Sequence, residues 1–197
     1  MLIHYPSESI VCGVDEAGRG CIAGPVVAAA VILPKGFQHP LINDSKKLNE
    51  ATRKALAELI KKEAKAYSVG IIDNQIIDKV NILQATYLAM HQAIAQIQPI
   101  PDLLIIDGNR FKPYPEIAHQ TIIKGDATYI EIAAASILAK THRDDLMEAY
   151  SKKFPQYNWQ QNKGYPTLQH KKSVWSFGYS PLHRLTFNIN KQLSMFD

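Results

Sequence analysis

The stretch Ile10-Val11-Cys12-Gly13-Val14-Asp15-Glu16-Ala17-Gly18-Arg19-Gly20 joins an apolar run to two adjacent carboxylates and a glycine-rich turn. The apolar run Ile10–Val14 predicts a strand with both acids at its end. Adjacent acids repel each other, and a half-buried carboxylate costs free energy unless a cation pairs with it. A divalent metal ion would meet both needs, and turn amides with one Arg are groups that hold phosphate oxygens. The stretch predicts a metal site beside a phosphodiester-binding loop.

The rest of the pattern predicts an α/β fold with a central mixed β-sheet flanked by helices. Val26–Leu33 is apolar on both faces, which is typical of a central strand. Further strands are predicted at Tyr67–Ile72, Leu103–Ile106 and Thr121–Ile123, and helices from an Asn49 cap to about Lys65, over Ile82–Gln96 and from Tyr129 to about Lys153. At 197 residues we expect a single domain, 1–197, with a basic and aromatic helical extension over about 155–197.

Charge and composition favour a polyanionic partner. The net charge of +4 conceals an asymmetry, since the residues from Ala149 to Asp197 hold seven Lys or Arg and one acid. The same segment holds both tryptophans, and basic groups interleaved with aromatics suit a polyanion that has bases to stack on. The alternative, a solvated basic face over an aromatic mini-core, stays open.

Nothing in the composition indicates a membrane or secreted protein. Met1–Ser9 do not form a charged leader, and the longest apolar run, Val26–Leu33, ends at Pro34 and is too short for a bilayer. Cys12 and Cys21 form no CxxC pair, and we expect two free, partly buried thiols. We therefore expect a cytoplasmic protein without membrane contact, and a monomer as the default state.

Acidic residues follow several of the predicted strands, and we expect them to converge. The carboxylates that would meet where strands end are those of Asp15, Glu16, Asp107 and Asp126. Such a set of oxygen ligands favours Mg²⁺ or Mn²⁺ over Zn²⁺. Such a carboxylate site is a standard means of activating water against a phosphodiester. Neighbouring strand residues point to opposite faces, so Asp15 and Glu16 share a site only if the chain has already turned or Glu16 also uses its carbonyl.

Other residues are candidates for substrate contact. Ser45 and Lys46, in a loop before a predicted helix, and Lys124, two residues before Asp126, could hold phosphate. Tyr165, fixed between Gly164 and Pro166, could stack on a sugar or base. Each has an ordinary alternative: a charged loop for the first three residues and a core edge for the tyrosine.

Seven motifs occur in an order that resembles the ribonuclease HII family, the bacterial type 2 ribonucleases H. They cover the chain from about Val11 to Phe187 and are DEAGRG at 15–20, AGPV at 23–26, DSKKL at 44–48, DGN at 107–109, KGD at 124–126, AAASILAK at 133–140 and GYPT at 164–167. The resemblance implies a ribonuclease H-like fold with a helical C-terminal extension. It also implies a metal-dependent endonuclease that cuts the RNA strand of RNA/DNA hybrids and single ribonucleotides in duplex DNA, leaving 5′-phosphate and 3′-hydroxyl ends.

The resemblance assigns roles to the same residues. The family's four metal-site acids correspond to Asp15, Glu16, Asp107 and Asp126. Its loop that reads the ribose 2′-hydroxyl corresponds to Gly18, Arg19 and Gly20, and its junction-sensing tyrosine to Tyr165. The chain departs from the family pattern at Cys21, where proline is common, and this residue bears on junction preference.

Two other interpretations remain: another carboxylate-metal nuclease of the same fold, such as an integrase or resolvase-like enzyme, and a non-catalytic nucleic-acid-binding module. An all-DNA substrate separates the first from a ribonuclease, because that class needs no 2′-hydroxyl reader. The second predicts binding without cleavage. The final residues Gln192, Leu193, Met195 and Phe196 also suggest a short tail for a sliding clamp, with an ordinary amphipathic terminus as the alternative.

Overall fold

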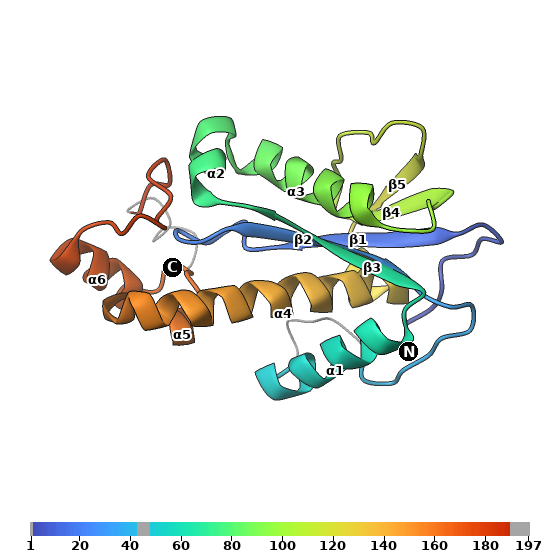
Figure 1. Cartoon of the computed structure of the whole chain (residues 1–197), viewed down its shortest axis with the longest axis horizontal. Helices are drawn as coiled ribbons and strands as arrows, with labels where there is room; N and C mark the ends of the chain where they lie inside the picture. The colour runs from blue at the N-terminus through green and yellow to red at the C-terminus, as the bar shows by residue number, and fades with distance from the viewer. Residues whose placement is uncertain (1, 43–47, 190–197) are drawn as a thin grey trace.

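A computed structural model describes residues 2–42 and 48–189, and its centre is a mixed five-stranded sheet (Figure 1). The spatial order is β3-β2-β1-β4-β5, with β1, β2 and β3 antiparallel and β4 and β5 parallel to β1. The strands are β1 Val11–Ala17, β2 Val26–Ile32, β3 Ala66–Ile72, β4 Leu103–Asp107 and β5 Ala118–Ile122. The predicted mixed sheet is confirmed, and β1 runs three residues further than predicted.

Helices cover both faces of this sheet. Figure 1 shows α2 and α3 on one face and α1 and α4 on the other. The helical segments are α1 Glu50–Glu63, α2 Asn74–Val80, α3 Ile82–Gln96, α4 Ile130–Lys153, α5 Trp159–Asn162 and α6 Leu168–Phe177, with 3₁₀ turns η1 Gly125–Ala127 and η2 Pro155–Tyr157. The three predicted helices are present, and Asn49 caps α1 through the Thr52 N–H. Helix α2 was not predicted; Asp73 caps it by accepting from the Ile76 N–H.

The side-chain alternation of β1 decides which face each functional group occupies. Cys12 and Val14 point into the core beneath α3. Gly13 lies against α4, where an added Cβ would be 2.2 Å from the Glu131 carbonyl carbon. Helix α4 therefore packs directly on the β1 backbone, and only glycine permits that distance. Continuing the alternation, Asp15 points to the α4 side and Glu16 to the α3 side.

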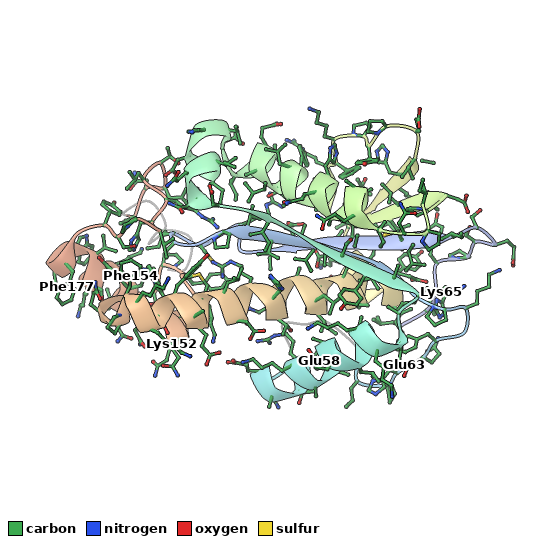
Figure 2. The ribbon with its side chains drawn as sticks, viewed as in Figure 1. Glu58, Glu63, Lys65, Lys152, Phe154 and Phe177 are labelled. Carbon is green, nitrogen blue, oxygen red and sulfur yellow. The ribbon has the colours of Figure 1, made fainter. Side chains whose placement is uncertain are left out.

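The C-terminal segment confirms an aromatic mini-core and also leaves aromatic groups exposed. Tyr157 stacks on Trp159 with ring centroids 5.2 Å apart, and the indole N–H of Trp159 donates to His170. Trp175 and Phe177 of α6 are more than half exposed. Figure 2 shows Phe177 and Phe154 at the end of the molecule opposite Lys65. The aromatic mini-core is thus present, and contact of the exposed groups with a polyanion stays a prediction.

Cys12 and Cys21 are both free, as predicted, and both are fully buried where partial burial was expected. None of the helices within 2–42 and 48–189 is long and apolar enough to cross a membrane.

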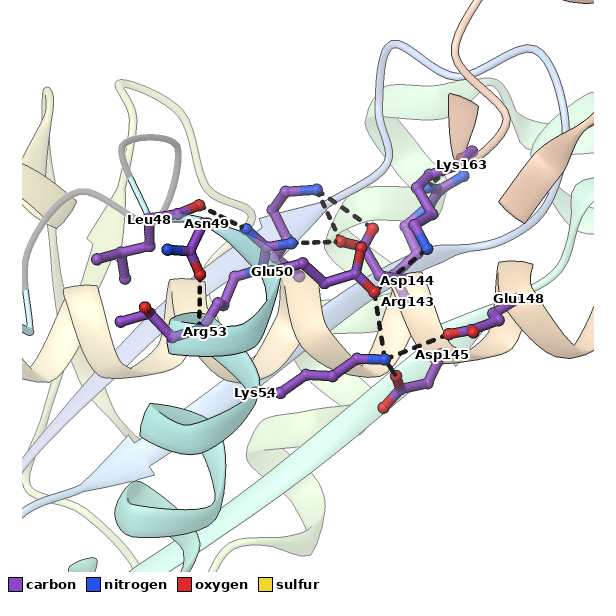
Figure 3. Close-up of polar contacts among 12 residues, drawn as sticks. Leu48, Asn49, Glu50, Arg53, Lys54, Arg143, Asp144, Asp145, Glu148 and Lys163 are labelled. Carbon is purple, nitrogen blue, oxygen red and sulfur yellow. Dashed lines mark hydrogen bonds and ion pairs between the residues drawn. The ribbon is translucent and has the colours of Figure 1, made fainter. Parts of the chain in front are cut away.

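A buried ion pair joins α1 to α4 (Figure 3). Arg53 donates to Asp144 at 2.9 Å, and both side chains are buried. Lys140 reaches the same carboxylate at 3.2 Å. Next to this cluster, Lys54 contacts Glu50, Asp145 and Glu148 at the surface. Asp144 is thus a buried acid with two cationic partners.

Replacing Arg53 should therefore cost far more stability than replacing its neighbour Lys54. Arg53→Ala leaves Asp144 buried with one cation and should lower the free energy of unfolding by ~3–5 kcal/mol. Lys54→Ala removes only exposed ion pairs and should cost less than about 1 kcal/mol. Urea unfolding of the two variants measures both values, and equal losses would show that the buried pair has no special weight.

Candidate active site

Asp15 and Glu16 are inside β1, not beyond it. They pair with Ala29 and Ala28 of β2, so the strand has not turned where they stand. Both carboxylates nevertheless line one pocket. Asp15 lies with Ser136 and Lys140 of α4 in a pocket of about 320 Å³. Glu16 lines this pocket too, and it also borders a smaller one beside α3.

Asp107 brings the two carboxylates into one electrostatic cluster. It is the last residue of β4, the parallel neighbour of β1, one residue beyond the Val14–Ile106 pair. Asp107 lines both pockets, as Glu16 does, and its charge acts on both Asp15 and Glu16. Its Oδ1 atom accepts from the Gly125 N–H at 2.8 Å. The predicted convergence of Asp15, Glu16 and Asp107 is therefore present at the carboxyl ends of β1 and β4.

The electrostatics of this cluster favour a bound cation. Burial raises the pKa of Asp15 well above its ordinary value, and repulsion from Glu16 and Asp107 raises it further. Burial also raises the pKa of Glu16, against the opposing effect of a 3.0 Å bond from Arg19. Charged carboxylates are thus costly here unless positive charge enters the pocket. An all-oxygen donor set of this kind suits a hard divalent cation.

The side chains are not already folded around one point. Within residues 2–42 and 48–189, no group of three or more His, Cys, Asp or Glu side chains is arranged as a ready set of metal ligands. Asp15 and Glu16 leave opposite faces of β1, so an ion shared by both would need a side-chain rotation toward Asp107, or use of the Glu16 carbonyl oxygen.

Asp126 and Lys124 lie close to this cluster, but neither lines the pocket around it. Asp126 is buried in η1, and its N–H is 3.4 Å from Asp107 Oδ1. Lys124 is exposed and begins η1 in the left-handed conformation with φ 57°. Their roles as fourth ligand and phosphate contact stay predictions. Ser45 and Lys46 lie outside the described residues.

The glycine-rich loop and the predicted tyrosine line the same pocket as the carboxylates. Gly18, Arg19, Gly20 and Tyr165 all border it. Gly18 has φ +95°, a conformation that favours glycine, and a Cβ on Gly20 would meet no atom within 4 Å. The inner side of the loop is thus packed and its outer side open. Backbone groups of this loop can approach a ligand closely.

Two pocket residues were missed as site residues by the sequence analysis. Ser136 and Lys140 lie four residues apart on α4, so both point to the same side. A hydrogen bond with Ser136 opposes the rise in the Asp15 pKa, and Lys140 Nζ is 5.9 Å from the centre of the Tyr165 ring. The sequence could have indicated them, because both residues belong to the AAASILAK motif at 133–140, which is one of the seven motifs of the family resemblance.

The mixed sheet order and the carboxylates at its strand ends define a nuclease of the ribonuclease H-like class, and the comparisons give its family. The family model described as Ribonuclease HII matches residues 12–190. The ribonuclease HII of Bacteroides fragilis is 53% identical over 199 residues, covering 100% of this chain and 99% of that protein. That of Porphyromonas gingivalis is 57% identical, covering 95% and 94%. The chain belongs to the ribonuclease HII family and is an endoribonuclease of the ribonuclease H type.

Solved structures confirm the fold. The ribonuclease H2 of Pyrococcus horikoshii superimposes with a TM-score of 0.77 at 24% identity, covering 94% of this chain and 97% of that one. The ribonuclease HII in a PCNA complex from Archaeoglobus fulgidus gives 0.74 at 25% identity, with 91% and 95% covered. Bst-RNase HIII in complex with Mn²⁺ gives 0.72 at 20% identity, with 95% and 70% covered.

Removing the negative charge of Asp107 should raise the thermal midpoint of the metal-free protein in EDTA, and should reduce the increase in midpoint that added Mg²⁺ causes. Asp107→Asn keeps an acceptor for the Gly125 N–H and relieves repulsion of Asp15 and Glu16. Its thermal midpoint in EDTA should rise by about 2–4 °C, the size expected for ~1 kcal/mol in a chain of this length. Added Mg²⁺ should raise the midpoint of the unmodified protein and raise that of the variant less.

Asp145→Asn is the matched control, because Asp145 is an exposed acid on α4 that pairs with Lys54. It should respond to Mg²⁺ as the unmodified protein does. Identical metal responses in all three proteins would place the cation site elsewhere.

Proposed function

We propose that this chain hydrolyses phosphodiesters at ribonucleotides, both in the RNA strand of RNA/DNA hybrids and at single ribonucleotides in duplex DNA, leaving 5′-phosphate and 3′-hydroxyl ends. One observation carries the proposal. A single pocket joins the buried carboxylate of Asp15 and the partly buried carboxylates of Glu16 and Asp107 to the Gly18–Gly20 loop, whose outer side is open. The first group suits a cation and the second a sugar-phosphate backbone, and the family assignment agrees with both.

The carboxylates of Asp15, Glu16 and Asp107 are proposed to hold one or two Mg²⁺ or Mn²⁺ ions, with Asp126 as the fourth ligand. Such ions, when bound, lower the pKa of a water molecule and stabilise the departing 3′ oxygen. The protein's own part is to keep these oxygens charged and close together. The Gly125 N–H holds Asp107 in place, and Ser136 favours the charged form of Asp15. The manganese complex of the related Bst-RNase HIII supports a divalent ion.

Selectivity for a ribonucleotide requires a contact with the 2′-hydroxyl, since that group distinguishes RNA from DNA locally. The backbone of Gly18, Arg19 and Gly20 is proposed to make it, because the outer side of this loop is open. Tyr165 is proposed to stack on the adjoining nucleotide. Burial raises the pKa of its phenol to about 12, so the ring is neutral at physiological pH. Cys21 Sγ lies 3.8 Å from the Lys163 carbonyl and is buried, so its effect on junction preference would be indirect.

Binding of the duplex is proposed to use the basic C-terminal segment together with Ser45, Lys46 and Lys124. Each phosphate contact releases counterions, so affinity should fall steeply with salt. The exposed rings of Trp175 and Phe177 in α6 add stacking surfaces. We propose that the protein acts in the cytoplasm as a monomer.

We also propose a sliding clamp as a partner of the final residues Gln192, Leu193, Met195 and Phe196, which lie outside the described residues. A ribonuclease HII from Archaeoglobus fulgidus has been solved as a PCNA complex, which supports this pairing. Deleting residues 190–197 should abolish clamp binding and leave cleavage of a short duplex unchanged. Clamp binding by the shortened chain would overturn the proposal.

Cleavage of a DNA duplex with one ribonucleotide, beside an all-DNA duplex, tests the main proposal. A cut at the 5′ side of the ribonucleotide that needs Mg²⁺ or Mn²⁺ is the expected result. Asp15→Asn should abolish cleavage and retain duplex binding. Cutting of the all-DNA duplex would favour an integrase or resolvase-like enzyme, and binding without any cleavage a non-catalytic module.

Tyr165→Ala should reduce cleavage at an isolated ribonucleotide more than cleavage of a long hybrid. Stacking on an aromatic ring contributes ~1–3 kcal/mol, so kcat/KM on the single-ribonucleotide duplex should fall about tenfold or more. Tyr165→Phe keeps the ring and should stay within about threefold of the unmodified enzyme. Equal losses on both substrates for Tyr165→Ala would show a structural role only.

A further inference from the structure

Arg143 of α4 is buried beneath the pocket and joins the two loops that line it. It is 1% exposed. Its Nε and Nη2 atoms donate to the carbonyl oxygens of Pro25 and Ala23, both at 3.0 Å. Its Nη1 atom donates to the carbonyl of Lys163 at 2.7 Å. One guanidinium thus binds the chain just after the Gly18–Gly20 loop and the chain two residues before Tyr165.

Arg184 approaches the same loop from the C-terminal segment. It is completely buried, and its Nη1 atom donates to the carbonyl of Arg19 itself at 3.1 Å. Its Nε and Nη2 atoms donate to Gly24 at 3.0 Å and Pro25 at 3.1 Å. The Pro25 carbonyl oxygen therefore accepts from both arginines. Together the two side chains bind the backbone of the loop from residue 19 to residue 25 at four carbonyls.

Neither guanidinium forms an ion pair with any carboxylate in the part of the chain that the structure describes. Arg53, the third buried arginine, differs because it is paired with Asp144. Burying a guanidinium without a carboxylate is costly, and burial lowers the pKa of Arg184 to about 10. Six directed hydrogen bonds to carbonyls offset that cost only in this geometry, because the planar fork has fixed donor directions. The arrangement therefore specifies a loop conformation.

The glycines of both loops fit around Arg143. A Cβ on Gly18 would lie 2.1 Å from Arg143 Nε, and one on Gly164 would lie 3.3 Å from Nη2. The loops also bind each other, since the Ile22 N–H donates to the Gly164 carbonyl at 2.9 Å. Displacing the guanidinium would release the Gly18–Gly20 loop and the Tyr165 loop together.

We propose that Arg143 and Arg184 are positioning residues for substrate selectivity: they fix the backbone of Gly18–Gly20 relative to Tyr165, so that both contacts are made only when one ribonucleotide is followed by DNA. This inference deepens the proposed function and rests on it. A long hybrid has a 2′-hydroxyl on every RNA nucleotide, so its cleavage tolerates a variable distance between the two loops. An isolated ribonucleotide has a single 2′-hydroxyl, so its cleavage depends on a fixed distance between the Gly18–Gly20 loop and Tyr165.

The test compares Arg143→Lys and Arg184→Lys with the unmodified enzyme on two substrates, a duplex with one ribonucleotide and a long RNA/DNA hybrid, each with Mg²⁺. Lysine keeps the charge and loses the fork. The ratio of kcat/KM on the first substrate to kcat/KM on the second should fall about tenfold, chiefly through kcat. If Arg184→Lys does not fold, Arg184→Gln is measured in its place, because glutamine removes the buried charge and keeps amide donors.

Ile60→Val is the control for a general loss of stability, because Ile60 is a buried core residue of α1 remote from both loops. It should lower the thermal midpoint and leave the ratio within about twofold. An unchanged ratio in the arginine variants, or an equal fall in the control, overturns the positioning role. Failure of the unmodified enzyme to cut the single-ribonucleotide duplex would instead overturn the proposed function.

Discussion

The direct packing of α4 on the backbone of β1 is the constraint on which the site depends. Gly13 allows the helix to approach the strand so closely that any Cβ would overlap the Glu131 backbone. This close contact between the α4 and β1 backbones fixes the positions of three α4 side chains relative to the strand. Ser136 lies beside Asp15, Lys140 lies in the pocket, and Arg143 lies under the glycine-rich loop.

The fold treats its buried acids in two different ways. Asp144 is paired within the structure with Arg53 and Lys140, so its buried charge is compensated. Asp15 has like charges as neighbours, and burial and repulsion raise its pKa. Because that folded-state pKa exceeds the unfolded one, the contribution of Asp15 to stability falls as pH rises from the ordinary carboxyl value through the raised value. The protein thus retains a destabilising group where function needs it.

The sequence predicted the sheet, three helices and the carboxylate cluster, because each has a local signal. Apolar runs marked the strands, Asn49 marked a helix start, and Asp15, Glu16 and Asp107 stood beside strand ends. The predicted end of β1 at Val14 was wrong. The two acids that follow it were interpreted as lying beyond the strand, but they pair with Ala28 and Ala29 of β2. The buried roles of Asp144, Arg143 and Arg184 could not be predicted, because they depend on contacts between segments far apart in the chain.

The decisive measurement is a structure of the enzyme with a duplex that contains one ribonucleotide, in the presence of Ca²⁺. We expect a cation within about 2.3–2.6 Å of oxygens from both Asp15 and Asp107. We also expect the ribose 2′-hydroxyl within about 2.7–3.2 Å of a backbone group of Gly18–Gly20. A cation bound elsewhere, or a 2′-hydroxyl that faces solvent, would show that the pocket does not act as the active site proposed here.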